Sequence, residues 1–154
     1  MAPSDAPTVV ALVQAVLAEY GFTAEVGGIR EDMAALDRYE RGGAGFWVAD
    51  LDGRIVGTVA IRPKQGATCE LKRLYVLAEA RGHGVGRALY AHAESFARGA
   101  GYERIWLDSS RRFRDARRLY ERSGFSLLEE KDNDWEDNVY EKRLTSDLPS
   151  KEQP

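Results

Sequence analysis

Apolar residues along this chain follow two different spacings. In some segments they recur every three or four positions, which is the pattern of a helix that buries one face. In others they alternate with polar residues or form short runs rich in β-branched and aromatic residues, which is typical of strands. This pattern predicts helices over residues 8–20, 31–41, 85–99 and 113–122, and strands over residues 46–51, 54–61, 68–76, 104–107, 125–128 and 138–144.

The connections indicate how these elements pair. Asp52-Gly53 separates the first two strands and is a strong hairpin signal, and residues 63–66, which begin with proline and end with glycine, predict the next turn. A strand, the helix over residues 85–99 and another strand then follow one another, which predicts a parallel pair with a right-handed crossover. The expected fold is therefore α/β of the α+β type, with a mixed, mostly antiparallel sheet of about six strands and helices on both faces.

Length and composition favour one domain. The chain has 154 residues, of which 44% are hydrophobic, and this suits one compact core. We expect the domain to span residues 1–144 and the polar, proline-containing tail over residues 145–154 to be disordered. The single cysteine, Cys69, fits a reducing compartment, and no apolar run approaches the length of a membrane span. We therefore expect a cytoplasmic protein that does not contact membranes.

Charge is distributed unevenly along the chain. The formal net charge is −3, yet residues 62–122 hold fourteen Lys and Arg against seven Asp and Glu. A basic central segment suits an anionic ligand. Because the excess is local and no DNA-reading helix stands out, nucleic acid is not an expected partner.

A glycine-rich turn lies inside this basic segment. Gly82, Gly84 and Gly86 separate a strand from a helix, so backbone N–H groups can converge on a ligand there without interference from side chains. The helix that follows adds unpaired N–H groups and the positive end of its dipole. The turn is thus a candidate site for phosphate oxygens, and Arg81 and Arg87 could add further donors.

Two other protein classes use a similar turn. A P-loop requires Lys followed by Ser or Thr after the glycines, but Arg87 and Ala88 stand there. A dinucleotide-binding fingerprint requires a third glycine where this chain has Leu89, although Asp108 resembles the ribose-binding acid of that motif. The antiparallel strands that open the sheet and the single crossover leave no doubly wound sheet for a dinucleotide.

The turn is also part of a larger pattern. Arg81-x-x-Gly84-x-Gly86 follows the strand Leu71-Lys-Arg-Leu-Tyr-Val76, and Leu119-Tyr120-x-x-x-Gly124-Phe125 lies downstream. Together these motifs resemble the GNAT superfamily of acetyl-CoA-dependent N-acetyltransferases, and the resemblance covers residues 8–144 in element order. It implies a central bulged strand that splays from its parallel neighbour, with the pantetheine arm of the coenzyme between them.

The resemblance implies acetyl-CoA as the co-substrate. The diphosphate would bind the glycine turn, and the pantetheine amides would bind the open edge of the central strand, where a main-chain N–H polarises the thioester carbonyl. The residues expected to bind the coenzyme are Leu74, Tyr75, Val76, Arg81, Gly82, His83, Gly84, Val85, Gly86 and Arg87. No metal site is expected, because the histidines and Cys69 lack the spacing of metal ligands.

The resemblance also implies two catalytic residues. Tyr120 has the position of the family's tyrosine beside the coenzyme sulfur, where a protonated phenol can donate to the departing thiolate; otherwise it packs its helix against the sheet. Glu70 corresponds to the general-base glutamate of several members, or else it pairs with a lysine or arginine. It precedes Leu74 by four residues, so strand alternation would place both on one face. Asp108 and Ser109 would face the acceptor as cation ligands, or cap the next helix.

Two features depart from the family pattern. Phe113 stands where many members have an asparagine that contacts the coenzyme, so Arg112, Arg114 or Arg117 would bind phosphate in its place. The family's first strand has no expected counterpart, because residues 1–7 are few and rich in proline.

The expected activity is direct acetyl transfer from coenzyme A to an amine on a small molecule or a peptide. No acyl-enzyme is expected, because Cys69 forms no Cys–His pair. The acidic loop over residues 129–137 favours a cationic acceptor, but the identity of the acceptor and the oligomeric state stay open, a homodimer included. Two alternatives on the same fold are a non-catalytic acetyl-CoA-binding module and a partner-docking domain. The presence of both Glu70 and Tyr120 favours the enzyme.

Overall fold

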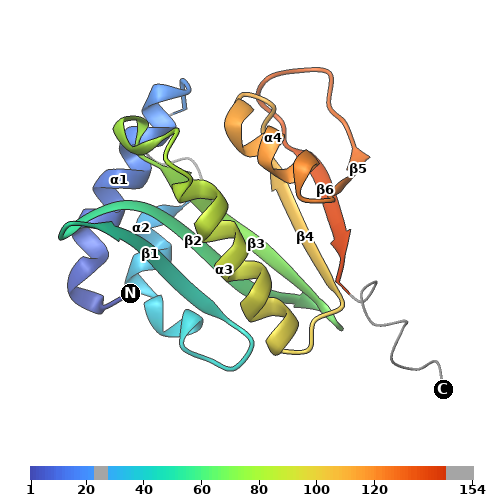
Figure 1. Cartoon of the computed structure of the whole chain (residues 1–154), viewed down its shortest axis with the longest axis horizontal. Helices are drawn as coiled ribbons and strands as arrows, with labels where there is room; N and C mark the ends of the chain where they lie inside the picture. Colours follow the sequence, from blue (N-terminus) through green and yellow to red (C-terminus); the bar gives the residue numbers. More distant parts are fainter. Residues whose placement is uncertain (23–27, 145–154) are drawn as a thin grey trace.

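The computed structural model describes residues 1–22 and 28–144, and the tail predicted to be disordered lies outside this part of the chain. Figure 1 shows a twisted sheet with helices on both faces. The helices are α1 (Ala6–Glu19), α2 (Ile29–Ala34), α3 (Val85–Gly99) and α4 (Arg114–Arg122), with 3₁₀ turns at Pro3–Asp5, Leu36–Tyr39 and Ala78–Ala80. The strands are β1 (Gly45–Leu51), β2 (Arg54–Gln65), β3 (Thr68–Val76), β4 (Arg104–Ser109), β5 (Ser126–Glu129) and β6 (Asn138–Arg143).

The sheet formed by these residues has six strands in the order β1-β2-β3-β4-β6-β5. Neighbouring strands are antiparallel except for β3 and β4, which are parallel and are connected through α3. The predicted mixed, mostly antiparallel sheet with one central parallel pair is therefore confirmed. Within the described N-terminal residues no strand precedes α1, as expected from the proline-rich start.

The end of β2 differs from the prediction. β2 continues through Pro63 to Gln65, so the turn before β3 consists of Gly66-Ala67 and the turn predicted over residues 63–66 is wrong. A proline is tolerated here because it lies beyond the last residue of β2 that pairs with β1 and beside an irregularity in the pairing with β3.

Each face of the sheet has its own apolar layer. α3 and α4 pack on one face, where Val59, Ile61 and Ile105 are fully buried. α1 and α2 cover the other face with side chains such as Val13 and Leu17. The predicted helices on both faces are thus present, and the sheet between them carries the residues that border the candidate site.

β3 contains a β-bulge at Arg73, whose φ of 61° lies in the left-handed region. The extra residue shifts the alternation of side chains along the strand. Cys69 and Leu71 pack in the core on the α3 side, and beyond the bulge Leu74 does so as well. Glu70 lies between the first two and so faces the opposite side. The prediction that Glu70 and Leu74 share one face is therefore wrong.

Two buried contacts hold this bulge. The Arg73 side chain donates through Nε to Oδ2 of Asp32 in α2 at 2.7 Å, and only 7% of Arg73 is exposed. The hydroxyl of Thr58 in β2, which is fully buried, donates to the Arg73 carbonyl oxygen at 2.6 Å. A left-handed conformation costs a residue other than glycine about 1–3 kcal/mol. The ion pair and the hydrogen bond offset this cost.

The bulge lies where β3 and β4 separate. The two strands pair only over three positions, from Thr68 opposite Arg104 to Glu70 opposite Trp106. Residues 71–76 have no ladder partner on the β4 side among the described residues, and the strands diverge along this stretch (Figure 1). The splayed parallel pair implied by the resemblance is present.

We expect Asp32→Asn to lower the free energy of unfolding by about 3 kcal/mol, because one partner of a buried ion pair loses its charge. Urea denaturation followed by circular dichroism measures this change. Glu79→Gln is the matched control, since the ion pair between Glu79 and Arg54 has side chains 55% and 62% exposed, and its loss should leave the midpoint unchanged. Equally small effects of both substitutions would show that Asp32 does not hold the bulge.

Candidate active site

The gap between β3 and β4 opens into two adjoining cavities. One, of about 490 Å³, lies beside the glycine turn and α4. The other, of about 700 Å³, lies beside the end of β4 and the loop between β5 and β6. Leu74, Tyr75, Phe113 and Ala116 line both cavities, so the two meet at the unpaired edge of β3. Cavities of these sizes suit small-molecule ligands.

The glycine turn and the first turn of α3 border the smaller cavity. Gly82 and Gly84 have φ angles of 82° and 80°, which are easily adopted only by glycine. Gly84 is the N-cap of α3, so the unpaired N–H groups of the helix begin at the cavity wall. The glycine turn predicted from the sequence is therefore present, and its backbone borders the cavity.

Gly86 is not required by the conformation of the chain. It has no positive φ, and a Cβ added there would lie 3.6 Å from Cγ2 of Val76, an ordinary van der Waals contact. Alanine would favour the helix by up to about 1 kcal/mol. The absence of a side chain at this position therefore leaves the backbone accessible from the cavity.

Besides Arg81, three arginines line the smaller cavity, namely Arg87 of α3 and Arg118 and Arg122 of α4. Sequence reasoning missed the two on α4, although their spacing of four residues places them on one face of the helix and could have identified them. The arginines expected to replace the usual asparagine do not line this cavity: Arg112, Arg114 and Arg117.

Nine of the ten residues expected to bind the coenzyme line the smaller cavity. The exception is His83, whose Nδ1 lies 3.4 Å from the carbonyl oxygen of Ala80. Arg81 lines the cavity, but its guanidinium pairs with Glu19 of α1 and its Nε donates to the Val76 carbonyl at 3.1 Å. Arg81 therefore connects α1 to the end of β3.

Tyr120 of α4 lines the larger cavity, and only 4% of the residue is exposed. Its ring centroid lies 5.6 Å from that of Phe125 and 5.8 Å from that of Tyr140, so it does pack the helix against the sheet. Burial raises the pKa of its phenol well above the ordinary value of 10.0. The hydroxyl therefore stays protonated at neutral pH.

Glu70 lines the same cavity, with 13% of its side chain exposed. Its Oε1 accepts a hydrogen bond from Nε of Arg62 at 2.9 Å, so the pairing with an arginine that the sequence left open is present. A carboxylate has two oxygens and several acceptor positions. The ion pair therefore does not prevent Glu70 from accepting a further proton or hydrogen bond.

Three more carboxyl groups border this cavity, those of Asp108 at the end of β4, Glu136 in the loop between β5 and β6, and Asp137 just before β6. Partial burial and the neighbouring charge of Glu70 raise the pKa of Asp108. Partial burial and the charge of Asp108 raise the pKa of Asp137. Asp108 does not cap α4, because the N-cap of that helix is Phe113. The alternative role of Asp108 as a helix cap is therefore wrong.

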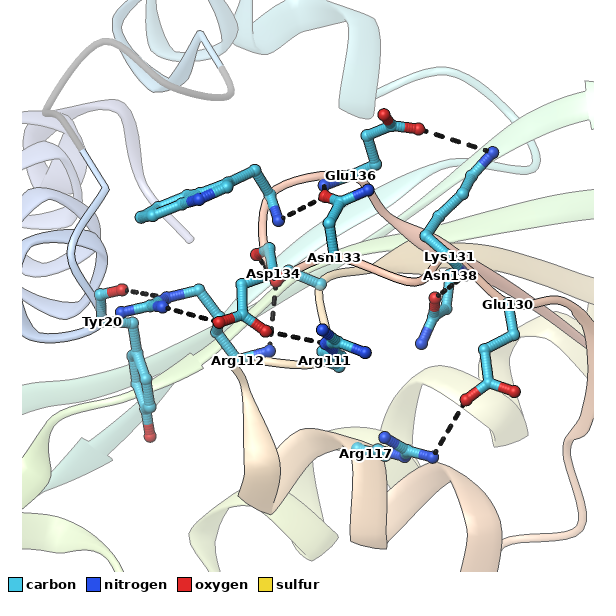
Figure 2. A network of polar contacts seen from close by, with 12 residues as sticks. Tyr20, Arg111, Arg112, Arg117, Glu130, Lys131, Asn133, Asp134, Glu136 and Asn138 are labelled. Atoms are coloured by element: carbon cyan, nitrogen blue, oxygen red, sulfur yellow. Dashed lines mark hydrogen bonds and ion pairs between the residues drawn. The ribbon is translucent and has the colours of Figure 1, made fainter.

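The loop between β5 and β6 borders the larger cavity and is held by the polar network in Figure 2. Nε of Arg112 donates to the Tyr20 carbonyl at 2.7 Å, and its guanidinium lies 4.6 Å from the centre of the Trp135 ring. Nε of Arg111 donates to Oδ1 of Asp134 at 2.7 Å. These contacts attach the loop to the segment between β4 and α4 and to the end of α1, so Arg112 positions the cavity wall.

Cys69 is fully buried in the core on the α3 side, and burial raises its pKa to about 12. Its thiol is therefore protonated at neutral pH and does not suit a nucleophile. Among residues 1–22 and 28–144, no group of three or more His, Cys, Asp and Glu could hold a metal ion. None of the helices in the same residues is long and apolar enough to span a membrane.

Comparisons with solved structures show the same fold. An acetyltransferase of the GNAT family from Staphylococcus aureus Mu50 has a TM-score of 0.83 at 18% identity, with 94% of this chain and 96% of that chain covered. The PaiA N-acetyltransferase of Thermoplasma acidophilum, solved in complex with coenzyme A, has a TM-score of 0.75 at 22% identity, with 94% and 96% covered.

Sequence comparisons identify the family. An uncharacterised N-acetyltransferase of Escherichia coli K12, YjgM, is 33% identical over 132 residues, which cover 81% of this chain and 78% of YjgM. Rat N-acetylaspartate synthetase is 37% identical over 100 residues, which cover 63% of this chain but 33% of that protein. The model of the Acetyltransferase (GNAT) family matches residues 11–125. The chain therefore belongs to the GNAT family of acetyltransferases and is an acyltransferase.

Proposed function

We propose that this acyltransferase moves the acetyl group of acetyl-CoA directly to the amine of an acceptor in the larger cavity. The observation that carries the proposal is the open edge of β3, where residues 71–76 lack a ladder partner on the β4 side among the described residues. This edge lies between the glycine turn and Tyr120. The binding of coenzyme A by PaiA, which has this fold, supports the assignment of the coenzyme.

The smaller cavity suits the phosphates of the coenzyme. Residues 82–87 supply main-chain N–H groups, and Arg87, Arg118 and Arg122 supply positive charge. The amides of the pantetheine arm can bind the free edge of β3 as an added strand would. This arrangement brings the thioester to the junction of the two cavities, which Leu74 and Tyr75 line from β3.

Acetyl transfer requires two proton movements. The acceptor nitrogen forms a bond to the thioester carbonyl carbon and the carbon–sulfur bond breaks, so the nitrogen must lose a proton and the thiolate must gain one. Tyr120 donates the proton to the thiolate, and Glu70 takes the proton of the amine, directly or through water. A main-chain N–H of residues 74–76 stabilises the negative charge that develops on the carbonyl oxygen.

We expect Gly86→Ala to weaken binding of coenzyme A by at least about tenfold. The added methyl restricts access of phosphate to the backbone, and the loss of one charge-assisted hydrogen bond weakens binding by about this factor. The unfolding temperature should stay the same or rise. Calorimetric titration with coenzyme A and thermal unfolding of the free protein measure the two effects. The control is Gly99→Ala at the other end of α3, where no atom lies within 4 Å of the added Cβ. Unchanged affinity for coenzyme A in Gly86→Ala would contradict phosphate binding at the turn.

We expect Tyr120→Phe to bind acetyl-CoA normally but to lower kcat by about a hundredfold, the smaller end of the effect of a general acid. Thiol release under saturating acetyl-CoA measures the rate. Tyr90→Phe is the matched control, because Tyr90 is 5% exposed and lines neither cavity. Unchanged turnover in Tyr120→Phe would remove this tyrosine from the mechanism.

Glu70→Gln should lower kcat/KM and remove from its pH dependence the acidic limb that reports ionisation of the base. Arg62→Gln breaks the same ion pair but keeps the carboxylate, so it should keep the limb. The pH dependence of kcat/KM in all three proteins separates a base from a structural partner. If Glu70→Gln shows the profile of the parent, another group or bulk water takes the proton.

A further inference from the structure

We propose that the acceptor is an alkyl amine with a second positive charge, and that its distant ammonium group binds between Asp108 and Asp137. The inference rests on the proposed acetyl transfer and names the acceptor class of the larger cavity. It concerns the end of that cavity formed by β4 and by the residues that precede β6.

The pairing register brings three carboxyl groups to one face of the sheet. Glu70 of β3 lies beside Trp106 of β4, and Asp108 follows two residues later, which returns it to the same face. Asp108 lies opposite Val139 of β6, and Asp137 precedes Val139 by two residues. Such diagonal positions on neighbouring strands are about 7–8 Å apart. One small cation can therefore interact with both aspartates.

Positive side chains at this cavity already have carboxylate partners. Nζ of Lys131 lies 2.6 Å from Oε2 of Glu129. Nζ of Lys72 lies 3.9 Å from Oδ2 of Asp32, the same oxygen to which Arg73 donates. Lys131 is thus neutralised by Glu129, whereas Lys72 shares the single carboxylate of Asp32 with Arg73. The lining of the cavity is still acidic, because Glu70, Asp108, Glu136 and Asp137 outnumber these cations.

Asp108 and Asp137, by contrast, have no ion pair within the described residues. Each has a raised pKa caused by partial burial and by a neighbouring carboxylate, Glu70 for Asp108 and Asp108 for Asp137. Burial is the larger cause, and repulsion between like charges adds to it. A bound ammonium group relieves this repulsion, whereas an acceptor with a distant carboxylate adds to it.

The acidic loop as a whole does not account for this preference. Of the acids over residues 129–137, Glu129 pairs with Lys131, and Asp134 pairs with Arg111. Glu130 and Glu136 likewise lie 3.9 Å from basic side chains. The prediction of a cationic acceptor from the composition of this loop thus needs a different basis, which Asp108 and Asp137 provide.

The rest of the cavity suits a carbon chain with a reactive polar end. Phe22 stacks on Phe113 with ring centroids 5.3 Å apart, and Trp135 meets Phe22 edge-on at 5.6 Å. All three rings line the cavity, which gives methylene groups an apolar wall. Tyr120, a residue 4% exposed, also lines it. The cavity thus presents a polar group for the reacting end, an apolar wall, and two carboxylates for the distant end.

Three amines of matched carbon chain test the proposal: 1,4-diaminobutane, butylamine and 4-aminobutanoate. They differ at the distant end, which is an ammonium, a methyl or a carboxylate group. We expect kcat/KM for the diamine to exceed that for butylamine by at least about tenfold, the effect of one charge-assisted hydrogen bond, and 4-aminobutanoate to be the poorest acceptor. Equal rates for the diamine and butylamine, or a preference for 4-aminobutanoate, would overturn the proposal and leave acetyl transfer itself intact.

Single substitutions assign the preference to the two aspartates. Asp108→Asn and Asp137→Asn should each reduce the ratio of kcat/KM between the diamine and butylamine severalfold. Asp132→Asn makes the same charge change in the loop outside both cavities and should leave the ratio unchanged. A ratio that does not respond to either cavity variant would place the second ammonium elsewhere and refute the assignment.

Binding without turnover separates this inference from the proposed function. In the presence of free coenzyme A, the diamine should raise the unfolding temperature more than butylamine does, and Asp108→Asn should remove the difference. This result supports the acceptor class even if no amine releases thiol, in which case acetyl transfer is the proposal that fails. Equal shifts for the diamine and butylamine overturn the acceptor class whatever the outcome of the transfer assay.

Discussion

The buried ion pair between Asp32 and Arg73 is the interaction on which the rest of the site depends. It holds the one non-glycine residue of β3 with a left-handed backbone, and the hydroxyl of Thr58 holds the carbonyl of the same residue. The ladder between β3 and β4 ends at Glu70, three residues before Arg73, and the bulge lies on the strand segment whose edge toward β4 is open. Because α2 supplies Asp32, a helix on one face of the sheet stabilises the bulge in β3, a strand at the centre of the sheet.

The gap has opposite charges at its two ends. Arginines of α3 and α4 and the N–H groups of the glycine turn border the smaller cavity, where a polyanionic coenzyme is proposed to bind. Carboxylates from β3, β4 and the residues before β6 border the larger one. A single unpaired strand edge joins them, so two ligands of opposite charge can approach the same point. The charge pattern therefore favours the encounter of a thioester with an amine.

Features that depend on a few neighbouring residues could be predicted from the sequence. The hairpin at Asp52-Gly53, the crossover through α3 and the glycine turn are present as predicted. Predictions that assumed regular strands were less successful. Pro63 lies within β2 because pairing is irregular around it, and one extra residue at Arg73 places Glu70 and Leu74 on opposite faces of the sheet. Irregularities of this kind arise from contacts with other elements, which periodicity does not record.

The sequence by itself determined the order of the elements, the family and the position of the glycine turn, since these follow from local backbone preferences and short motifs. Only the tertiary structure decided which charged groups are available to a ligand. Arg81 and Arg112 resemble phosphate ligands in the sequence, yet in the fold they connect β3 and the β5–β6 loop to α1. Asp108 and Asp137 become neighbours only because β6 pairs with β4. The physical reason is that electrostatic free energy depends on distance and burial, and both are properties of the folded chain.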